Sequence, residues 1–320
     1  MRREGSPWQG FGTVYVKELT DHISSIRMLV LGLLIFVISC VVVYFAIDNI
    51  RQTTAEDPFV LLKLFTSGPS VISLVFILSI TLPVMAIALG FDSINGEHNR
   101  RTMSRILSQP IYRDALLAGK FLAGLTTLGI NLLCLWLLVV GFGILLLGVP
   151  PGGEEIARSL AFMLLTLAYA GTWLALAMLL SIVSRSAATA VLVALGIWLF
   201  LTFLWPFLAN GFAALIAPPD PRYAMLGLMD PTTVTWGQVL QRLSPNELFT
   251  GASVILLAPE TRQASQIIDI NQWRGAVLGA PLPLSESLAI AWPQAVALIA
   301  GVIVLFVAGY IVFQRQEVRA

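Results

Sequence analysis

The sequence predicts an all-α fold, a polytopic membrane protein that forms a single transmembrane domain over residues 1–320. Composition supports this class first: 57% of the residues are hydrophobic and only 12% are charged, whereas about a quarter of a soluble domain is charged. The mean hydropathy is correspondingly high, at +0.85. In addition, the apolar residues gather in six runs, each about as long as the roughly 20 residues that a helix needs to cross the hydrocarbon core.

The six predicted spans are 28–47, 70–91, 121–149, 158–183, 187–209 and 289–313. The first run lacks a small-residue cleavage site, so we expect it to remain as a span. An even number of spans places both termini on one side of the membrane. That side carries 12 of the 19 lysine and arginine residues, and cytoplasmic loops carry the excess of these residues. The sequence therefore predicts an N-in, C-in topology.

Residues 8–26 form an amphipathic pattern ahead of the first span. Apolar side chains recur there at steps of three or four, namely Trp8, Phe11, Tyr15, Leu19 and Ile23, and polar residues occupy the other face. Aromatic residues on the apolar face favour an interfacial helix that lies along the cytoplasmic membrane surface. The alternative is a helix that only extends the first span into water.

Several kinds of chemistry are disfavoured by what the spans lack. We find no acidic or basic residue in the cores of the six spans, which argues against an ion-coupled carrier and against an intramembrane hydrolase. No phosphate-binding loop is present at Gly119-Lys120. The motif needs serine or threonine after the lysine and glycine five positions before the second glycine, whereas this chain has Phe121 and Asp114 there. No basic tail with interleaved aromatic residues indicates nucleic-acid binding. We therefore expect no catalytic residue in this chain.

Metal and disulfide chemistry are also not expected. Cys40 and Cys134 fall inside predicted spans, where cysteine acts as a small apolar packing residue. His22 and His98 are isolated histidines, and a metal site needs further cysteine, histidine or carboxylate ligands.

A polar stretch from Phe91 to Lys120 separates the second span from the third. Its basic residues are Arg100, Arg101, Arg105, Arg113 and Lys120. Pro110 interrupts helix formation, so the stretch is predicted to form two short helices, the first over about 93–108. Basic residues that only hold the segment on the cytoplasmic side of the membrane would explain the arginines. They would not explain the length of the stretch or its helix-proline-helix arrangement. We therefore favour a docking surface for a cytoplasmic partner.

The same stretch carries a recognisable pattern, formed by Asp92, Ile94, Gly96-Glu97, Thr102, Leu107-Ser108, Pro110-Ile111, Arg113 and Gly119-Lys120. This pattern resembles the signature of the ABC type-2 transporter permeases and, within that family, most closely the subfamily that serves maturation of nitrous-oxide reductase. The resemblance covers nearly the whole chain. One departure is Arg101, which stands where the family usually has glycine.

The resemblance implies a type-2 ABC exporter-like fold in a bacterial or archaeal cytoplasmic membrane. Residues 93–108 would be the coupling helix that docks on a cytoplasmic ABC ATPase subunit, and 8–26 would be a second contact. The expected docking residues are Glu97, Arg100, Arg101, Thr102 and Arg105. Two ATPase subunits and a second permease copy or paralogue would complete the assembly. ATP and Mg²⁺ would bind to the ATPase, so no cofactor is expected on this chain.

The implied function is that of a permease subunit, which couples ATP hydrolysis to export of a substrate or to an extracytoplasmic maturation partner. Two other classes stay open. The chain could be a membrane anchor or scaffold subunit of a multi-protein complex, or it could be a secondary transporter. Substrate identity does not follow from the fold class.

The second distinctive region is the extracytoplasmic segment 210–288, which is long for a linker. Ser244, Pro245 and Glu247 combine a capping box with proline at the first helical position, and this pattern predicts a helix that runs to about Ala258. The helix is too short to span a membrane, so we expect it to lie in or dip into the outer leaflet. It would either cap the bundle or contact a substrate or an extracytoplasmic partner.

Overall fold

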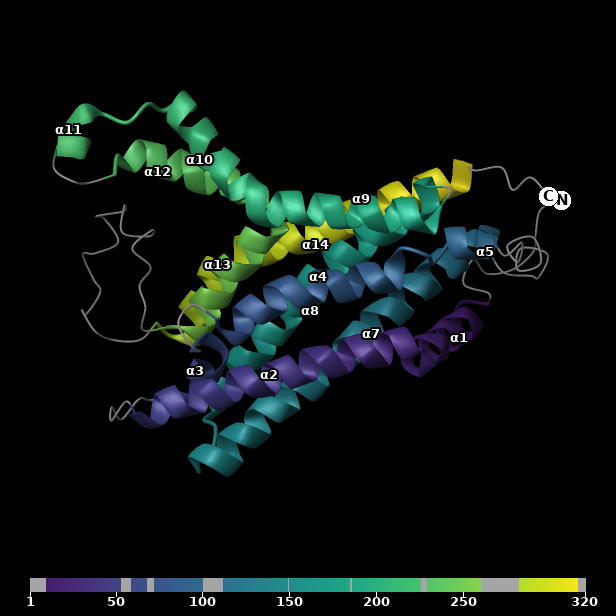
Figure 1. The fold of residues 1–320 in the computed structure, drawn as a ribbon, viewed down its shortest axis with the longest axis horizontal. Helices are drawn as coiled ribbons and strands as arrows, with labels where there is room; N and C mark the ends of the chain where they lie inside the picture. Colours follow the sequence, from purple (N-terminus) through teal and green to yellow (C-terminus); the bar gives the residue numbers. More distant parts are fainter. Residues whose placement is uncertain are drawn as a thin grey trace.

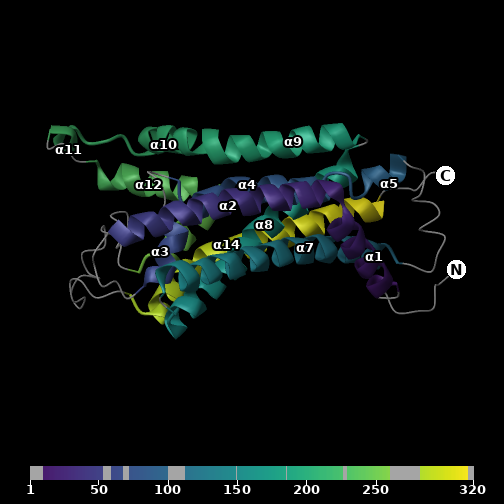
Figure 2. The same ribbon diagram turned by 60° about the horizontal axis from the view of Figure 1, so that its bottom comes forward.

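The structure is a computed structural model that describes residues 10–52, 59–67, 72–99, 112–148, 150–184, 186–225, 229–259 and 282–315. Within these ranges every regular element is helical, and six helices are long and apolar enough to cross a membrane. The predicted all-α, polytopic fold class is therefore confirmed. Figures 1 and 2 show the long helices running side by side along the long axis of the molecule.

The helical elements follow one another in a fixed order. They are α1 (Phe11–Ser24), α2 (Ile26–Gln52), α3 (Val60–Thr66), α4 (Leu74–Gly90), α5 (Asn95–Asn99), α7 (Arg113–Phe142), η1 (Gly143–Leu147), α8 (Gly153–Val183), α9 (Ala187–Leu199), η2 (Phe200–Leu204), α10 (Trp205–Ile216), α11 (Pro221–Met225), α12 (Pro231–Gln241), α13 (Pro245–Leu257) and α14 (Leu284–Arg315). The elements η1 and η2 are π-helical. One end of the bundle holds α1, α5 and the last turns of α14, whereas α3, α11 and α12 lie at the other (Figure 1). We call them the α5 end and the α12 end.

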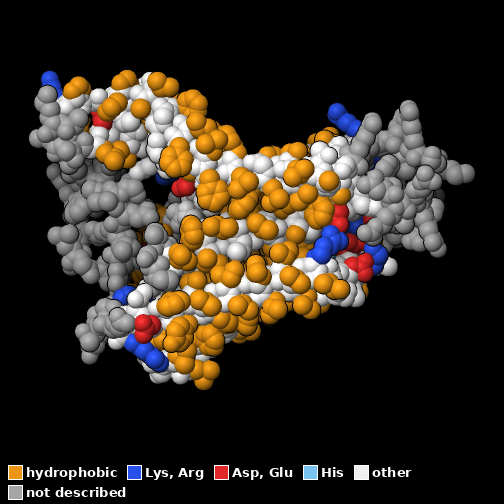
Figure 3. Space-filling model, in the orientation of Figure 1, with side chains coloured by type: hydrophobic (Ala, Val, Ile, Leu, Met, Phe, Trp, Pro, Cys, Tyr) orange, Lys and Arg blue, Asp and Glu red, His pale blue; other side chains and the backbone are white. Residues whose placement is uncertain are grey.

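Helix α8 forms the centre of the bundle and packs against α4, α7, α13 and α14. The approach between α4 and α8 is very close: a Cβ atom at Gly90 would lie 2.8 Å from Cβ of Ala177. Glycine is therefore required at this crossing, because any larger residue would push the helices apart. The outer helices instead expose apolar side chains, which cover the face seen in Figure 3 and suit a lipid environment.

Two carbonyl groups freed by proline are hydrogen-bonded by hydroxyl groups from other helices. Pro83 in α4 has no N–H to donate to the carbonyl of Ser79, and Tyr169 of α8 donates its hydroxyl to that oxygen at 2.8 Å. In the π-helix η2, each carbonyl pairs with the backbone N–H five residues later. The partner of the Leu201 carbonyl would be Pro206, which has no N–H to donate. Ser244 donates its Oγ to Leu201 at 2.8 Å. Such replacement bonds are what allow proline inside membrane helices.

Helix α13 begins midway through the bundle rather than at its edge. Its first residues lie beside Leu201, midway along the fifth span, and Asn246 lies 3.4 Å from the hydroxyl of Tyr169 in α8. From there α13 runs back to the α12 end, buried against α8 and α14. The predicted capping box is wrong, because Ser244 bonds to Leu201 instead of capping α13. Pro245 opens the helix, and Glu247 lies in its first turn.

Two buried charged side chains lie near the ends of long helices, outside the span cores that the sequence predicts to be free of charge. Lys120 lies inside α7, and Arg158 lies inside α8 with none of its surface exposed. At the α12 end, the guanidinium of Arg158 pairs with Glu154 at 2.8 Å and donates to Ser287 at 3.0 Å. It also donates to the carbonyls of Leu256 and Leu282. Each charge is tolerated because carboxylate and carbonyl oxygens surround it.

We predict that Tyr169→Phe lowers the free energy of unfolding by about 0.5–2 kcal/mol, because the Ser79 carbonyl then has no hydroxyl partner in an apolar interior. Thermal or denaturant unfolding in detergent would measure the change. Tyr310→Phe is a matched control, since the Tyr310 hydroxyl makes no hydrogen bond within the described ranges. Equal stability of the two variants would show that the freed carbonyl costs nothing.

Candidate functional site

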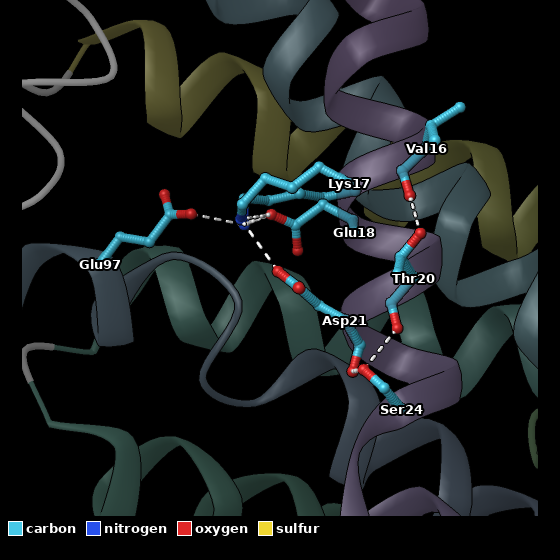
Figure 4. A network of polar contacts seen from close by, with 8 residues as sticks. Val16, Lys17, Glu18, Thr20, Asp21, Ser24 and Glu97 are labelled. Atoms are coloured by element: carbon cyan, nitrogen blue, oxygen red, sulfur yellow. Dashed lines mark hydrogen bonds and ion pairs between the residues drawn. The ribbon is translucent and has the colours of Figure 1, made fainter.

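Three helices meet at the α5 end around one buried lysine. The side chain of Lys120, on α7, is only 4% exposed. Its Nζ lies 2.9 Å from Oε1 of Glu18 on α1 and 2.7 Å from Oε1 of Glu97 on α5. Figure 4 shows Glu97 approaching from one side and the α1 residues from the other. We call this arrangement of Glu18, Glu97 and Lys120 the junction.

Close packing between α1 and α7 brings the junction residues together. A Cβ atom at Gly119 would lie 2.9 Å from Cγ1 of Val14, so only glycine lets the two helices approach this closely. Farther along, the Tyr15 hydroxyl donates to Oγ1 of Thr126 at 3.1 Å. The lysine that follows Gly119 is therefore placed directly beside α1.

The observed buried face of α1 differs from the apolar face predicted for it. Phe11, Tyr15 and Leu19 are partly buried, as their spacing suggests, but Ile23 is 56% exposed. Glu18, which the pattern places on the polar face, is buried instead. The physical reason is Lys120, whose charge compensates the carboxylate. Trp8 lies outside the described residues.

Helix α5 is also attached to the bundle through its backbone. The backbone N–H groups of Ile94 and Asn95 donate to Oγ of Ser181, on α8, at 3.1 and 3.2 Å. Beside it, Arg27 at the start of α2 pairs with Asp92 at 3.0 Å. The start of the predicted coupling segment is thus connected to α2, α7 and α8.

The first residues of α7 bind the end of α14. Arg113 donates to the carbonyls of Phe313 and Gln314 at 3.4 and 3.3 Å, and Gln314 donates to Asp114 at 2.5 Å. Two cations of the predicted docking stretch, Arg113 and Lys120, therefore have partners inside the chain. One oxygen of Glu97 is likewise bound to Lys120.

The remaining docking predictions, Arg100, Arg101, Thr102 and Arg105, lie outside the described residues. Sequence reasoning did not foresee the roles of Glu18 and Lys120. A signal was present in their spacing: Glu18 follows Val14 by one helical turn, on the face that packs on α7, and Lys120 follows the close-contact Gly119.

Ionisation states at the junction follow from burial and neighbouring charge. Burial alone would raise the pKa of Glu18, but Lys120 and Lys17 outweigh it and hold that pKa below its usual value. Burial lowers the pKa of His22 despite the nearby carboxylates, so this imidazole is neutral at pH 7. For Lys17, burial is outweighed by Glu18 and Asp21, which raise the pKa. The Glu18 carboxylate is therefore ionised at neutral pH.

Metal binding has no support in the described ranges. They contain no group of three or more histidine, cysteine or acidic residues close enough to hold an ion. Cys40 and Cys134 are both free thiols in the structure.

The comparisons with known proteins identify the class. The family model for ABC-2 family transporter proteins matches residues 13–318. The chain therefore belongs to the ABC-2 transporter family, and it is a multi-pass membrane protein of that family.

Two individual relatives are similar over most of their length. A protein of Pseudomonas aeruginosa, named probable ABC transporter permease protein NosY, is 25% identical over 283 residues, which cover 86% of this chain and 87% of the relative. A protein of Stutzerimonas stutzeri with the same name is 23% identical over 314 residues, or 94% of this chain and 96% of the relative.

We predict that Lys120→Met lowers the free energy of unfolding by about 3–5 kcal/mol, because Glu18 and Glu97 then carry buried charge without their shared cation. Denaturant unfolding in detergent would measure the loss. Lys17→Met is the matched control, since the side chain of Lys17 is 59% exposed and such pairs contribute about 0–1 kcal/mol. A loss of similar size in both variants would contradict the structural role of Lys120.

We predict an acid-dependent loosening of α1. Because the folded pKa of Glu18 lies below its ordinary value of 4.5, its contribution to stability is complete above that value. The contribution is lost as the pH falls through the folded pKa. Hydrogen exchange of the α1 amides should therefore accelerate below about pH 4.5 relative to the bundle. In Glu18→Gln, which cannot titrate there, this acceleration should be absent; an unchanged profile would contradict the assignment.

Proposed function

We propose that this chain is the permease subunit of an ABC transporter and that the junction couples it to a separate cytoplasmic ATPase. The observation that carries the proposal is the position of Lys120. One buried cation holds together α1, the start of the coupling segment 93–108, and a membrane-crossing helix. A force applied to either docking element would thus reach the bundle through a direct contact.

The energetics of the junction suit such a transmission. Separating a buried charge from its partner costs about 3–5 kcal/mol, whereas an apolar surface helix could slide with little resistance. A pull or push on α5 would therefore move α1 and α7 with it, as one rigid body. The backbone bonds from Ile94 and Asn95 to Ser181 extend the same connection to α8.

The proposed orientation places the α5 end in the cytoplasm, with an N-in, C-in topology. Its support is the distribution of lysine and arginine along the chain, with 12 of 19 on that side. We further propose a working unit of two permeases and two ATPases that exports a substrate or acts on an extracytoplasmic partner. The names of the two relatives, as probable ABC transporter permeases, support the permease role alone.

The test is affinity purification of the tagged chain in mild detergent, followed by mass spectrometry and an ATPase assay. We expect a nucleotide-binding ATPase subunit to co-purify. Arg101→Glu combined with Arg105→Glu should abolish that recovery, because two basic side chains of the proposed docking segment would become acidic and lose their charge complementarity with the ATPase. Arg222→Glu combined with Arg242→Glu is a matched control, since Arg222 lies in α11 and Arg242 directly follows α12, outside the predicted docking elements 8–26 and 93–108.

The outcomes separate docking from coupling. Normal recovery of the ATPase with the double reversal in 93–108 would overturn the assignment of the coupling helix. A preparation without any nucleotide-binding partner would favour the scaffold alternative. Lys120→Met should keep ATPase binding but lose the stimulation of ATP hydrolysis by the permease, provided that the variant remains folded.

A further inference from the structure

A partly open cavity lies beside the junction and is not explained by ATPase docking. Its volume is about 180 Å³, which is room for on the order of ten water molecules. It lies between α1, the start of α2, the end of α4, α5, α7 and α8. A cavity of this size holds a polar group with several heavy atoms, larger than a single ion.

The cavity wall carries charges of both signs. At its mouth, Lys17 pairs with Asp21 at 3.2 Å and also with Glu18 at 2.8 Å, and Arg27 pairs with Asp92 at 3.0 Å. The two basic side chains are about 60% exposed, so these pairs are weak and can exchange partners with a ligand. Glu18, Glu97 and Lys120 form the inner wall, where both carboxylates are paired with the lysine. The exchangeable basic and acidic groups at the mouth therefore suit a zwitterion.

The opposite wall of the cavity is apolar. Met28, Leu89, Leu174 and Met178 line it, and all four belong to the described part of the bundle interior. Figure 3 shows acidic and basic side chains gathered at one edge of the broad apolar face. A ligand that meets charge on one side and apolar surface on the other, at this boundary, has the chemistry of a phospholipid.

The type of headgroup follows from the side chains present. A primary ammonium donates three N–H bonds to carboxylates such as Asp21 and Asp92. A quaternary ammonium instead favours the faces of tryptophan, tyrosine and phenylalanine, and the described residues that line the cavity include none of these three. A headgroup with a phosphate and no amine would bring more negative charge to the carboxylates of the wall.

We propose that this cavity binds the headgroup of a phospholipid of the phosphatidylethanolamine class. Lys17 and Arg27 bind the phosphate, Asp21 and Asp92 accept hydrogen bonds from the ammonium, and Met28 and Leu89 contact the first part of the acyl region. The lipid would brace α1 against the end of α4. This inference concerns the permease itself and holds whether or not an ATPase partner exists.

The experiment is native mass spectrometry of the delipidated full-length chain, with phosphatidylethanolamine, phosphatidylcholine and phosphatidylglycerol of matched acyl chains added back. We expect the ethanolamine lipid to be retained at least about fivefold better than the other two, which corresponds to ~1 kcal/mol. Two variants test the site in different ways. Asp21→Asn with Asp92→Asn removes the ammonium acceptors, and Gly96→Leu fills the cavity without removing a charge.

A Cβ atom at Gly96 meets only Asp92, at 3.6 Å, so this substitution introduces no backbone clash. Both variants should lose the preference for the ethanolamine lipid, and Asp220→Asn with Glu286→Gln, at the α12 end, should keep it. Equal retention of the three lipids by the unmodified chain, or an unchanged preference in both cavity variants, would overturn the proposal.

Two further measurements test whether something other than a lipid occupies the cavity. Soluble glycerophosphoethanolamine should compete poorly, because it lacks the acyl region; competition as strong as that of the lipid would reassign the cavity to a soluble ligand. In a complex with the ATPase, the lipid should remain bound. Its displacement by the ATPase would show that the cavity is a protein contact and would overturn the lipid assignment.

Discussion

A cation cannot lie in a low-dielectric interior without compensation, and Lys120 is compensated by carboxylates that belong to two other helices. This constraint fixes the arrangement of the α5 end. Helix α1 must stay close enough to α7 for Glu18 to reach the lysine, and α5 must turn Glu97 inward. Glycine at position 119 permits that approach. The same contact that stabilises the fold is thus the one through which a docked partner would act.

At the α12 end, a second buried cation is also compensated by surrounding oxygen atoms. Arg158 is fully buried, and its guanidinium binds carbonyl and hydroxyl oxygens of α13 and α14 as well as Glu154. Between the two ends, the helices are connected by apolar packing and by single hydroxyl bonds such as those of Tyr169 and Ser244. Charged clusters therefore hold each end rigid, whereas the middle of the bundle contains the weaker connections.

The sequence predicted the fold class well because hydrophobicity over 20 residues is a strong and local signal, and six helices with this property are present. The tertiary use of single polar residues was harder to predict. Amphipathic spacing placed Glu18 in water, since the pattern of one helix carries no information about a lysine 102 positions away. Ser244 looked like a helix cap for a similar reason, because the carbonyl that attracts it belongs to another span. Arg101 and Arg105 remain predictions.

The distribution of strong and weak connections constrains how a transition could occur. Helices α9 and α10 form a separate layer in Figure 2. Helix α9 is joined to the rest through α8 and α4, and α10 is joined through α12. A π-helix at the middle of a span is a natural point for bending, because its backbone bonds are already irregular. If the junction moves α1, α5 and α7 as one body, strain would reach this layer through α8 and α4. The bend at η2 would then absorb it, while Arg158 keeps the α12 end together.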